Sequence, residues 1–298
     1  MENIIQQGIF ALASTNNKQK DNWFLGHIGA SIIAGGLFLH RKFVENQDTY
    51  QAILTRAEDE INKNKSFIIQ FDNNNLLSYK QSMQIIVNAI QKQKNQLMVD
   101  GHNVIFAALV IDAINEFKIS LSEEVINNIV NVLENCQNDN PKRYYSIDDH
   151  TKIPAPKTDI IDWNGFYKMV IDKSVTNVFH DIDGYFLAGC KLHGITFAHA
   201  ISIFKKLEHH QLANSLAKQL LKKIELSELH PKENVTKLVP YKFDVNELRV
   251  WRDVEGNDNA HQIKLVHSFY ELAQTLNVPT SKLDGLWGVF KAVRNNEK

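Results

Sequence analysis

Histidine is the residue type with the most chemical potential in this chain of 298 residues, which contains 12 of them. Four of these, His27, His102, His193 and His261, lie near the N-terminal ends of the most apolar helical patterns. A histidine in such a helix is either a core residue with a hydrogen-bond partner or a metal ligand. Burying four imidazoles for no shared purpose would cost desolvation free energy each time, so their number favours one metal site.

Helical spacing narrows the choice of ligands. His193 and His199 are six residues apart, which is about 120° around a helix, so one site would not use both. We assign His193 to the site and His199 to packing or to support of the ligands. Lys264 follows His261 by three residues and therefore shares its helix face.

The role of Lys264 is open at this point. It could pair with an acid or extend its amine to water. It could also take part in the site, either as a lysine of lowered pKa or as a carbamate formed with carbon dioxide. A carbamate would bind a metal ion as a carboxylate does.

Five other histidines are expected at the periphery. His209 and His210 lie among charged residues and should face water, and His40, His150 and His230 also look peripheral. The sequence contains no glycine-rich phosphate loop, no Gly-x-Ser-x-Gly elbow, no His-Glu-x-x-His and no Cys-x-x-Cys, so no other catalytic motif competes with the histidines.

Composition excludes several function classes. Lys and Arg number 33 and Asp and Glu 34, a formal net charge of −1, so there is no electrostatic case for nucleic acid or an anionic membrane. The two cysteines, Cys136 and Cys190, are too few for a disulfide framework or a four-thiolate zinc site. The N-terminus has no basic region before its apolar residues. We expect a cytoplasmic protein that binds neither membrane nor nucleic acid.

The elements that must position the histidines are predicted to be helices. Apolar residues recur mainly at helical spacing, and Gly (13) and Pro (6) are scarce, which predicts an all-α fold with central apolar helices. The expected helices span residues 2–13, 26–43, 47–64, 77–97, 102–118, 121–136, 163–178, 184–207, 209–225, 258–275 and 280–294. Ser120 and Ser122 precede Glu123 and Glu124 in a capping-box pattern. Lys65–Phe71 could form a short strand, but no nearby segment offers it a partner.

One stretch is apolar enough to raise the question of a membrane. Trp23–Leu39 has no formal charge apart from His27, and its length is at the bottom of the range for a membrane span. It holds four glycines, and we find no comparable stretch elsewhere. We interpret it as a helix buried in the core.

Two connections, Gln137–Asp162 and His230–Asn257, are long and contain prolines. Loops of this length are uncommon unless they are lids or linkers. A linker would separate two domains, whereas a lid would cover one site. Because the histidine-bearing helices fall on both sides of each loop, we favour one helical domain over residues 1–298 with the two loops as lids.

The histidine motifs resemble a known family. Leu-Gly-His27-Ile-Gly-Ala-Ser, Gly-His102-Asn-Val-Ile, Leu-His193-Gly-Ile-Thr-Phe-Ala-His-Ala and His261-Gln-Ile-Lys264 resemble, in order, the blocks of the questin oxidase-like family. Its members include helical oxidative enzymes of aromatic polyketide metabolism. The likeness runs from about residue 22 to residue 275 and is confined to these short motifs.

The resemblance implies an activity and a ligand set. His27, His102, His193 and His261 would bind non-haem iron (Fe2+), with Lys264 as a carbamylated ligand. Imidazole suits iron, and an oxygen donor beside it is similar to the facial triads that leave positions open for dioxygen. The protein would be an oxidoreductase, an oxygenase that takes dioxygen and an aromatic or polyketide-like small molecule.

Two other functions remain open. One is a zinc-dependent helical enzyme that resembles the lanthionine cyclases, which use a cysteine ligand, because Cys190 lies just before His193. The other is a helical ligand-binding or scaffold protein without enzymatic activity. Elemental analysis separates the three, because iron, zinc and no stoichiometric metal are their respective signatures.

Overall fold

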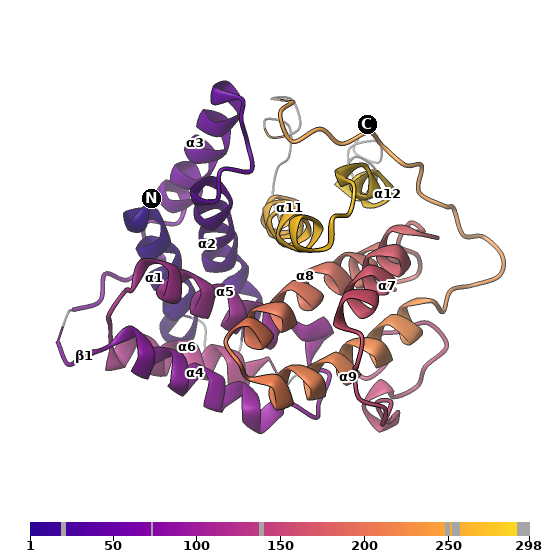
Figure 1. The fold of residues 1–298 in the computed structure, drawn as a ribbon, viewed down its shortest axis with the longest axis horizontal. Coiled ribbons are helices and arrows are strands. Elements are labelled where there is room, and N and C mark those ends of the chain that lie inside the picture. Colours follow the sequence, from indigo (N-terminus) through magenta and orange to yellow (C-terminus); the bar gives the residue numbers. More distant parts are fainter. Residues whose placement is uncertain (19–21, 73, 137–139, 248–250, 252–256, 291–298) are drawn as a thin grey trace. The chain divides into compact units, whose positions relative to one another are not determined.

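The computed structural model describes residues 1–18, 22–72, 74–136, 140–247, 251 and 257–290. In this part of the chain the regular structure is helical, with a two-residue antiparallel ladder and isolated bridges as its β-structure (Figure 1). The predicted all-α fold class is confirmed.

The helices begin and end close to the predicted positions. The α-helices are α1 (Glu2–Lys18), α2 (Gly26–His40), α3 (Gln47–Lys63), α4 (Tyr79–Gln93), α5 (His102–Phe117), α6 (Glu123–Asn135), α7 (Trp163–Val175), α8 (Leu187–Lys206), α9 (His210–Ser227), α11 (Asn257–Leu276) and α12 (Asp284–Trp287). Short 3-10 helices are η1 (Trp23–Leu25), η2 (Val99–Gly101), η3 (His150–Lys152) and η4 (Thr280–Leu283). Ser122 caps α6, because its side chain accepts a hydrogen bond from the amide of Val125, as the capping pattern predicts.

Two local predictions differ from the structure. Lys65–Phe71 consists of turns and irregular chain, whereas the ladder pairs β1 (Leu76–Leu77) with β2 (Leu121–Ser122). The helix predicted at 280–294 is η4 followed by the short α12, and residues 291–294 lie outside the described residues.

The chain divides into two compact units. The first comprises Met1–Gln93, His102–Gln137 and Val245–His267, and the second comprises Lys94–Gly101, Asn138–Asp244 and Ser268–Lys298. Helix α11 therefore supplies its first half to one unit and its second half to the other. The single domain with two lids stays a prediction, and residues 137–139, 248–250 and 252–256 of the two loops lie outside the described residues.

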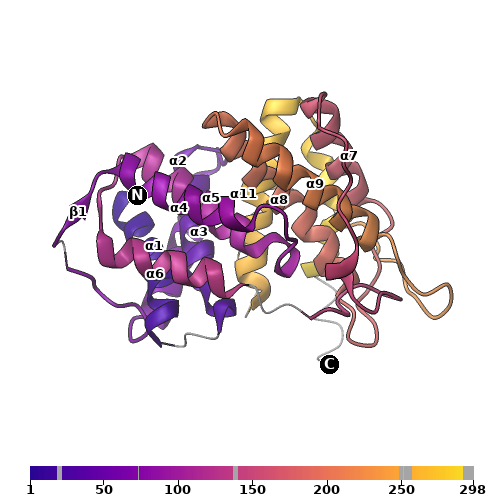
Figure 2. The same cartoon turned by 90° about the horizontal axis from the view of Figure 1, so that it is seen from below.

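In the first unit, α1 packs closely against α2 (Figure 2). The approach requires glycine: a Cβ on Gly29 would lie 2.6 Å from the carbonyl oxygen of Gly8 and even closer to the amide of Leu12. Gly26, at the start of α2, similarly lies against the Phe106 ring of α5. These contacts hold the first turn of α2, which carries His27, against α1 and α5.

In the second unit, α8 lies against both α7 and α9 (Figure 2). Almost the whole length of α8 is buried. Gly194 faces the Ser174 side chain of α7, where a Cβ would not fit without a shift. This close approach brings α8 against α7.

By length and composition, two helical stretches could cross a membrane, Trp23–His40 and Leu187–Lys206. The expectation that Trp23–Leu39 has no counterpart is therefore wrong. In the first stretch 72% of the residues are buried, and in the second 89%. Core helices of globular proteins can be equally long and apolar. Burial of this extent agrees with the interpretation of Trp23–Leu39 as a core helix.

Candidate metal centre

Three of the four predicted histidines gather in the first unit. His27 lies in the first turn of α2, His102 begins α5 and His261 lies in α11. The His27 ring centroid is 4.8 Å from that of His102 and 4.5 Å from that of His261. The His102 and His261 centroids are 6.4 Å apart. Three helices from distant parts of the sequence thus bring three imidazoles into one place.

The geometry of this histidine triad fits a single metal ion. One ligand atom from each of His27, His102 and His261 lies within 4.8 Å of the other two. With metal–imidazole distances of about 2.1 Å, two ligand atoms on one ion are at most about 4.2 Å apart. In a tetrahedral site the ligand atoms would be about 3.4 Å apart, so the widest pair would close by up to roughly 1.4 Å on metal binding, a movement within the range of side-chain rotation. His27 and His102 are buried and His261 is half-buried.

Aromatic rings surround the histidine triad. Trp23 lies 5.0 Å from the His102 ring, and Phe24 lies 4.6 Å from the His27 ring at an interplanar angle of 88°. Phe106 contacts both histidines, at 5.4 and 5.6 Å. Phe24 is 37% exposed, so one ring of this wall also meets solvent. An apolar wall limits access of water, which strengthens electrostatic interactions at the centre.

Lys264 lies in the same space as the histidine triad. Its Nζ is 2.6 Å from Nδ1 of His27, and its side chain is buried. Burial lowers the pKa of Lys264 to about 7, because a low-dielectric environment disfavours the charged amine. A lysine of this kind is neutral in part at physiological pH, and only the neutral amine can form a carbamate. The hydrogen bond to His27 also fixes the orientation of that ring.

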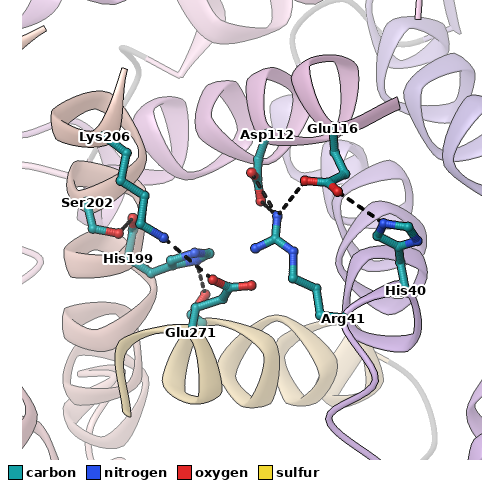
Figure 3. Close-up of polar contacts among 9 residues, drawn as sticks. His40, Arg41, Asp112, Glu116, His199, Ser202, Lys206 and Glu271 are labelled. Atoms are coloured by element: carbon teal, nitrogen blue, oxygen red, sulfur yellow. Dashed lines mark hydrogen bonds and ion pairs between the residues drawn. The ribbon is translucent and has the colours of Figure 1, made fainter. Parts of the chain in front are cut away.

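A second polar group on α5 belongs to the first unit. Arg41, just after α2, contacts Asp112 and Glu116, and Glu116 contacts His40 (Figure 3). The Arg41 guanidinium lies 3.0 Å from both oxygens of Asp112 and 3.7 Å from Glu116, and Glu116 lies 3.1 Å from His40. Asp112 and His267 have ligand atoms within 4.8 Å of each other. Because Arg41 binds both oxygens of Asp112, we interpret this group as an ion pair that joins the end of α2 to α5.

His193, the fourth predicted ligand, belongs to the second unit. Its Nδ1 lies 2.7 Å from the carbonyl oxygen of Gly189 in the preceding turn of α8. The ring is buried. Its role as a metal ligand stays a prediction.

In the same unit as His193, the buried carboxylate of Asp100 is surrounded by positively charged side chains. Asp100 lies 3.0 Å from Arg143 and 3.2 Å from Lys223, and Tyr144 donates a hydrogen bond to it at 2.8 Å. The Cys190 thiol lies 3.6 Å away. No sequence pattern predicts this Asp100 cluster, because its partners Arg143, Tyr144 and Lys223 are more than 40 residues away along the chain.

The charges of the Asp100 cluster shift its titrating groups. Burial alone would raise the pKa of Asp100, but Lys223, Arg143, His193 and the Tyr144 hydroxyl together hold it well below its usual range. Burial and the neighbouring carboxylate raise the pKa of the Cys190 thiol, so it stays protonated. Asp100 therefore acts as a fixed anion and Cys190 as a neutral thiol.

The backbone at Asp100 is strained. Val99, Asp100 and Gly101 all have positive φ, at 44°, 58° and 90°. A β-branched residue such as Val99 rarely adopts this conformation. Strain of this kind persists only where surrounding contacts enforce it, and here the cation contacts of Asp100 do so.

The remaining histidines divide between core and surface. His199 is buried with Nδ1 3.2 Å from the Ser268 hydroxyl, as its packing role predicts. On the same helix, Lys206 lies close to Glu271 (Figure 3). His210 is exposed and His209 half-buried. The peripheral position predicted for His150 is wrong: the residue is fully buried, its ring 5.3 Å from that of Tyr144.

The comparisons with known proteins add no relative. No family model matches the chain, and no curated protein or solved structure matches it either. What the structure supports is a buried group of histidines that could bind a metal ion.

Proposed function

We propose that this protein is a metal-dependent oxygenase in which His27, His102 and His261 hold a non-haem iron ion. The observation that carries the proposal is the convergence of three imidazoles from α2, α5 and α11 in a buried, aromatic-walled place. Imidazole suits iron, copper, nickel and zinc, so the donor set fits a transition metal without selecting one. Iron bound by three such ligands keeps positions open and supplies the capacity to activate dioxygen.

The chain's own residues would prepare the site for this chemistry. Trp23, Phe24 and Phe106 contact the imidazole rings, so they exclude water and restrict the histidines to few orientations. The Lys264 amine contacts Nδ1 of His27 and would keep Nε2 of that ring directed toward a metal ion. A carbamate on Lys264 would instead add an oxygen ligand.

The proposed substrate is an aromatic or polyketide-like small molecule. The support is the resemblance of the four histidine motifs to the questin oxidase-like family, together with the aromatic rings beside the histidine triad. Phe24 is partly exposed and offers a surface on which a flat, apolar molecule could stack. His193 would act as a fourth ligand only if the second unit brings it to the same ion.

Elemental analysis of the purified protein tests the proposal. We expect about one iron per chain after anaerobic loading, and loss of that iron when any residue of the histidine triad is replaced by Ala. One zinc bound by the same residues would favour the helical zinc enzyme. No stoichiometric metal under any loading condition would favour a scaffold or ligand-binding protein. His210→Ala is the matched control, because this histidine is exposed.

A further inference from the structure

A narrow pocket lies in the first unit, which also holds the histidine triad. Residues of α2, α3 and α11 line it: Ser31, Ile32, Gly35, Ile53, Arg56, Ala57, Glu60, Ala260 and Ile263. The cavity volume is about 20 Å³. This is enough for one molecule the size of water or a diatomic gas.

Helical spacing places one wall of this pocket about one turn from the candidate ligands. Ser31 follows His27 by one turn on α2, and Lys264 follows Ala260 by one turn on α11, a rise of about 6 Å in each case. His27 and Lys264 contact each other. The pocket wall therefore lies about one helical turn from the contact between the two helices at the histidine triad.

The interior of the pocket is apolar. Ile32, Ile53 and Ile263 are buried, and the Ser31 hydroxyl donates to the carbonyl oxygen of Ile28 in its own helix, so it adds little polarity. Apolar surface without a hydrogen-bond donor or acceptor does not hold an ordered water well.

Polar groups stand at the outer side. The Arg56 guanidinium donates to the Gln262 side chain at 2.5 Å, and Glu60 lies one turn further along α3. Burial lowers the pKa of Arg56 to about 10, with the charge of Glu60 acting in the opposite direction, so Arg56 keeps its charge near neutrality. Arg56 and Glu60 therefore lie at the opening of the pocket, and the isoleucines form its interior.

Glycine keeps this space open. A Cβ on Gly35 would meet only Ile263 at 3.7 Å and Ala57 at 3.9 Å, which is ordinary contact. By contrast, Gly29 and Gly36 of the same helix have neighbours at 2.6 Å. The position therefore has room for a side chain that the sequence does not supply.

We propose that this pocket is the entry and binding site for dioxygen, the small apolar co-substrate of the reaction. This inference rests on the proposed oxygenase function. Its size admits a diatomic molecule but no aromatic substrate. Its lining favours an apolar occupant, and the wall formed by Ser31 and Ala260 is about one helical turn from the contact between His27 and Lys264. Gly35 is then the residue that keeps the passage wide enough.

Xenon tests the pocket in the metal-free protein. Under xenon pressure, we expect shifts in the methyl NMR signals of Ile32, Ile53 and Ile263, and loss of these shifts in Gly35→Val. Ile53→Val enlarges the pocket and should strengthen xenon binding. Ile86→Val, which removes the same methylene group from a buried position on α4 outside the pocket, should not. Absence of xenon shifts in the wild-type protein, or shifts unchanged in Gly35→Val, would overturn the proposal.

The role in oxygen delivery is tested in the iron-loaded protein. Stopped-flow mixing with dissolved oxygen should show a slower reaction in Gly35→Val than in the wild type, with equal iron content. An equal rate would overturn the dioxygen role. If the protein binds xenon but takes up no iron under any loading condition, the proposed function is contradicted while a gas pocket remains, so the two failures are distinguishable.

Discussion

The Nζ atom of Lys264 lies 2.6 Å from Nδ1 of His27, although 237 residues separate them in the sequence. This contact joins α11 to the first turn of α2 and places the buried Lys264 amine beside a candidate ligand. Whether the lysine binds metal through a carbamate or orients the imidazole, removing it changes the surroundings of His27. The role of Lys264 is therefore separable from that of the histidines by substitution.

The histidine triad should behave as one binding unit. Replacing His27, His102 or His261 by Ala should weaken metal binding more than about tenfold, because each change removes a ligand and disturbs the other two. Titration with Co²⁺, followed by its visible absorption, measures the affinity. His193→Ala is the informative comparison: an equal loss would place His193 at the ion, and an unchanged affinity would exclude it.

The buried amine of Lys264 should make stability depend on pH. Its pKa is lowered from 10.5 in the unfolded chain to about 7 in the folded one, so between these values the unfolded state binds the extra proton. The free energy of unfolding of the metal-free protein should rise with pH from about 7 to 10, by up to roughly 1.4 kcal/mol per unit.

Urea denaturation at a series of pH values measures this effect. Lys264→Met should remove the rise, because the thioether does not titrate. Lys206→Met, at a position that is 54% exposed, is the control and should keep it. Parallel curves for the wild type and Lys264→Met would show that the amine is charged in both states.

Asp100 should be the most sensitive carboxylate of the second unit. Asp100→Asn keeps the shape but removes the negative charge, which leaves the fully buried Lys223 ammonium without this partner. Loss of one member of a buried ion pair costs about 3–5 kcal/mol. Chemical denaturation should detect it, whereas Asp149→Asn, at a half-buried position paired with the exposed Lys152, should change little.

The contribution of Asp100 to stability should depend on pH in the acidic range. The pKa of Asp100 is lowered in the folded state, so its contribution is complete above the unfolded carboxyl pKa of about 4. That contribution is lost as the pH falls below this value toward the folded pKa. Asp100→Asn should therefore lose less stability than the wild type on acidification from about pH 4 to pH 2. An identical loss in both proteins would contradict the assigned charge state.

The loop at Gln137–Asp162 should be anchored by Tyr144. Tyr144→Phe removes a hydrogen bond to a buried carboxylate, worth about 2 kcal/mol. We expect limited proteolysis within this loop to accelerate. Tyr145→Phe is the control, because Tyr145 is half-buried and packs on Tyr185. Cleavage at the same rate in Tyr144→Phe and the wild type would mean that other contacts hold the loop.

Particular residues show what the sequence could predict. His27, His102 and His261 were recognisable because each begins or lies near the start of an apolar helix, and helical periodicity identifies such helices well. Which helices meet in space is a matter of long-range packing, so the assignment of His193 beside the other three had no support from periodicity. Tyr144 and His150 are buried but lie in a segment without periodicity, and no local pattern indicates their burial.

Two glycines of α2, six residues apart, are subject to different constraints. Gly29 is fixed by the backbone of α1, so Gly29→Ala should cost about 1–3 kcal/mol through overpacking. Gly35→Ala meets ordinary contacts and should gain up to about 1 kcal/mol from helix propensity. A saturation library sorted once for folded protein and once for oxygen consumption would separate these constraints. Selection for folding alone should retain glycine at position 29 and accept other residues at position 35. If selection for oxygen consumption retains Gly35, then glycine is needed there for activity although it lowers stability.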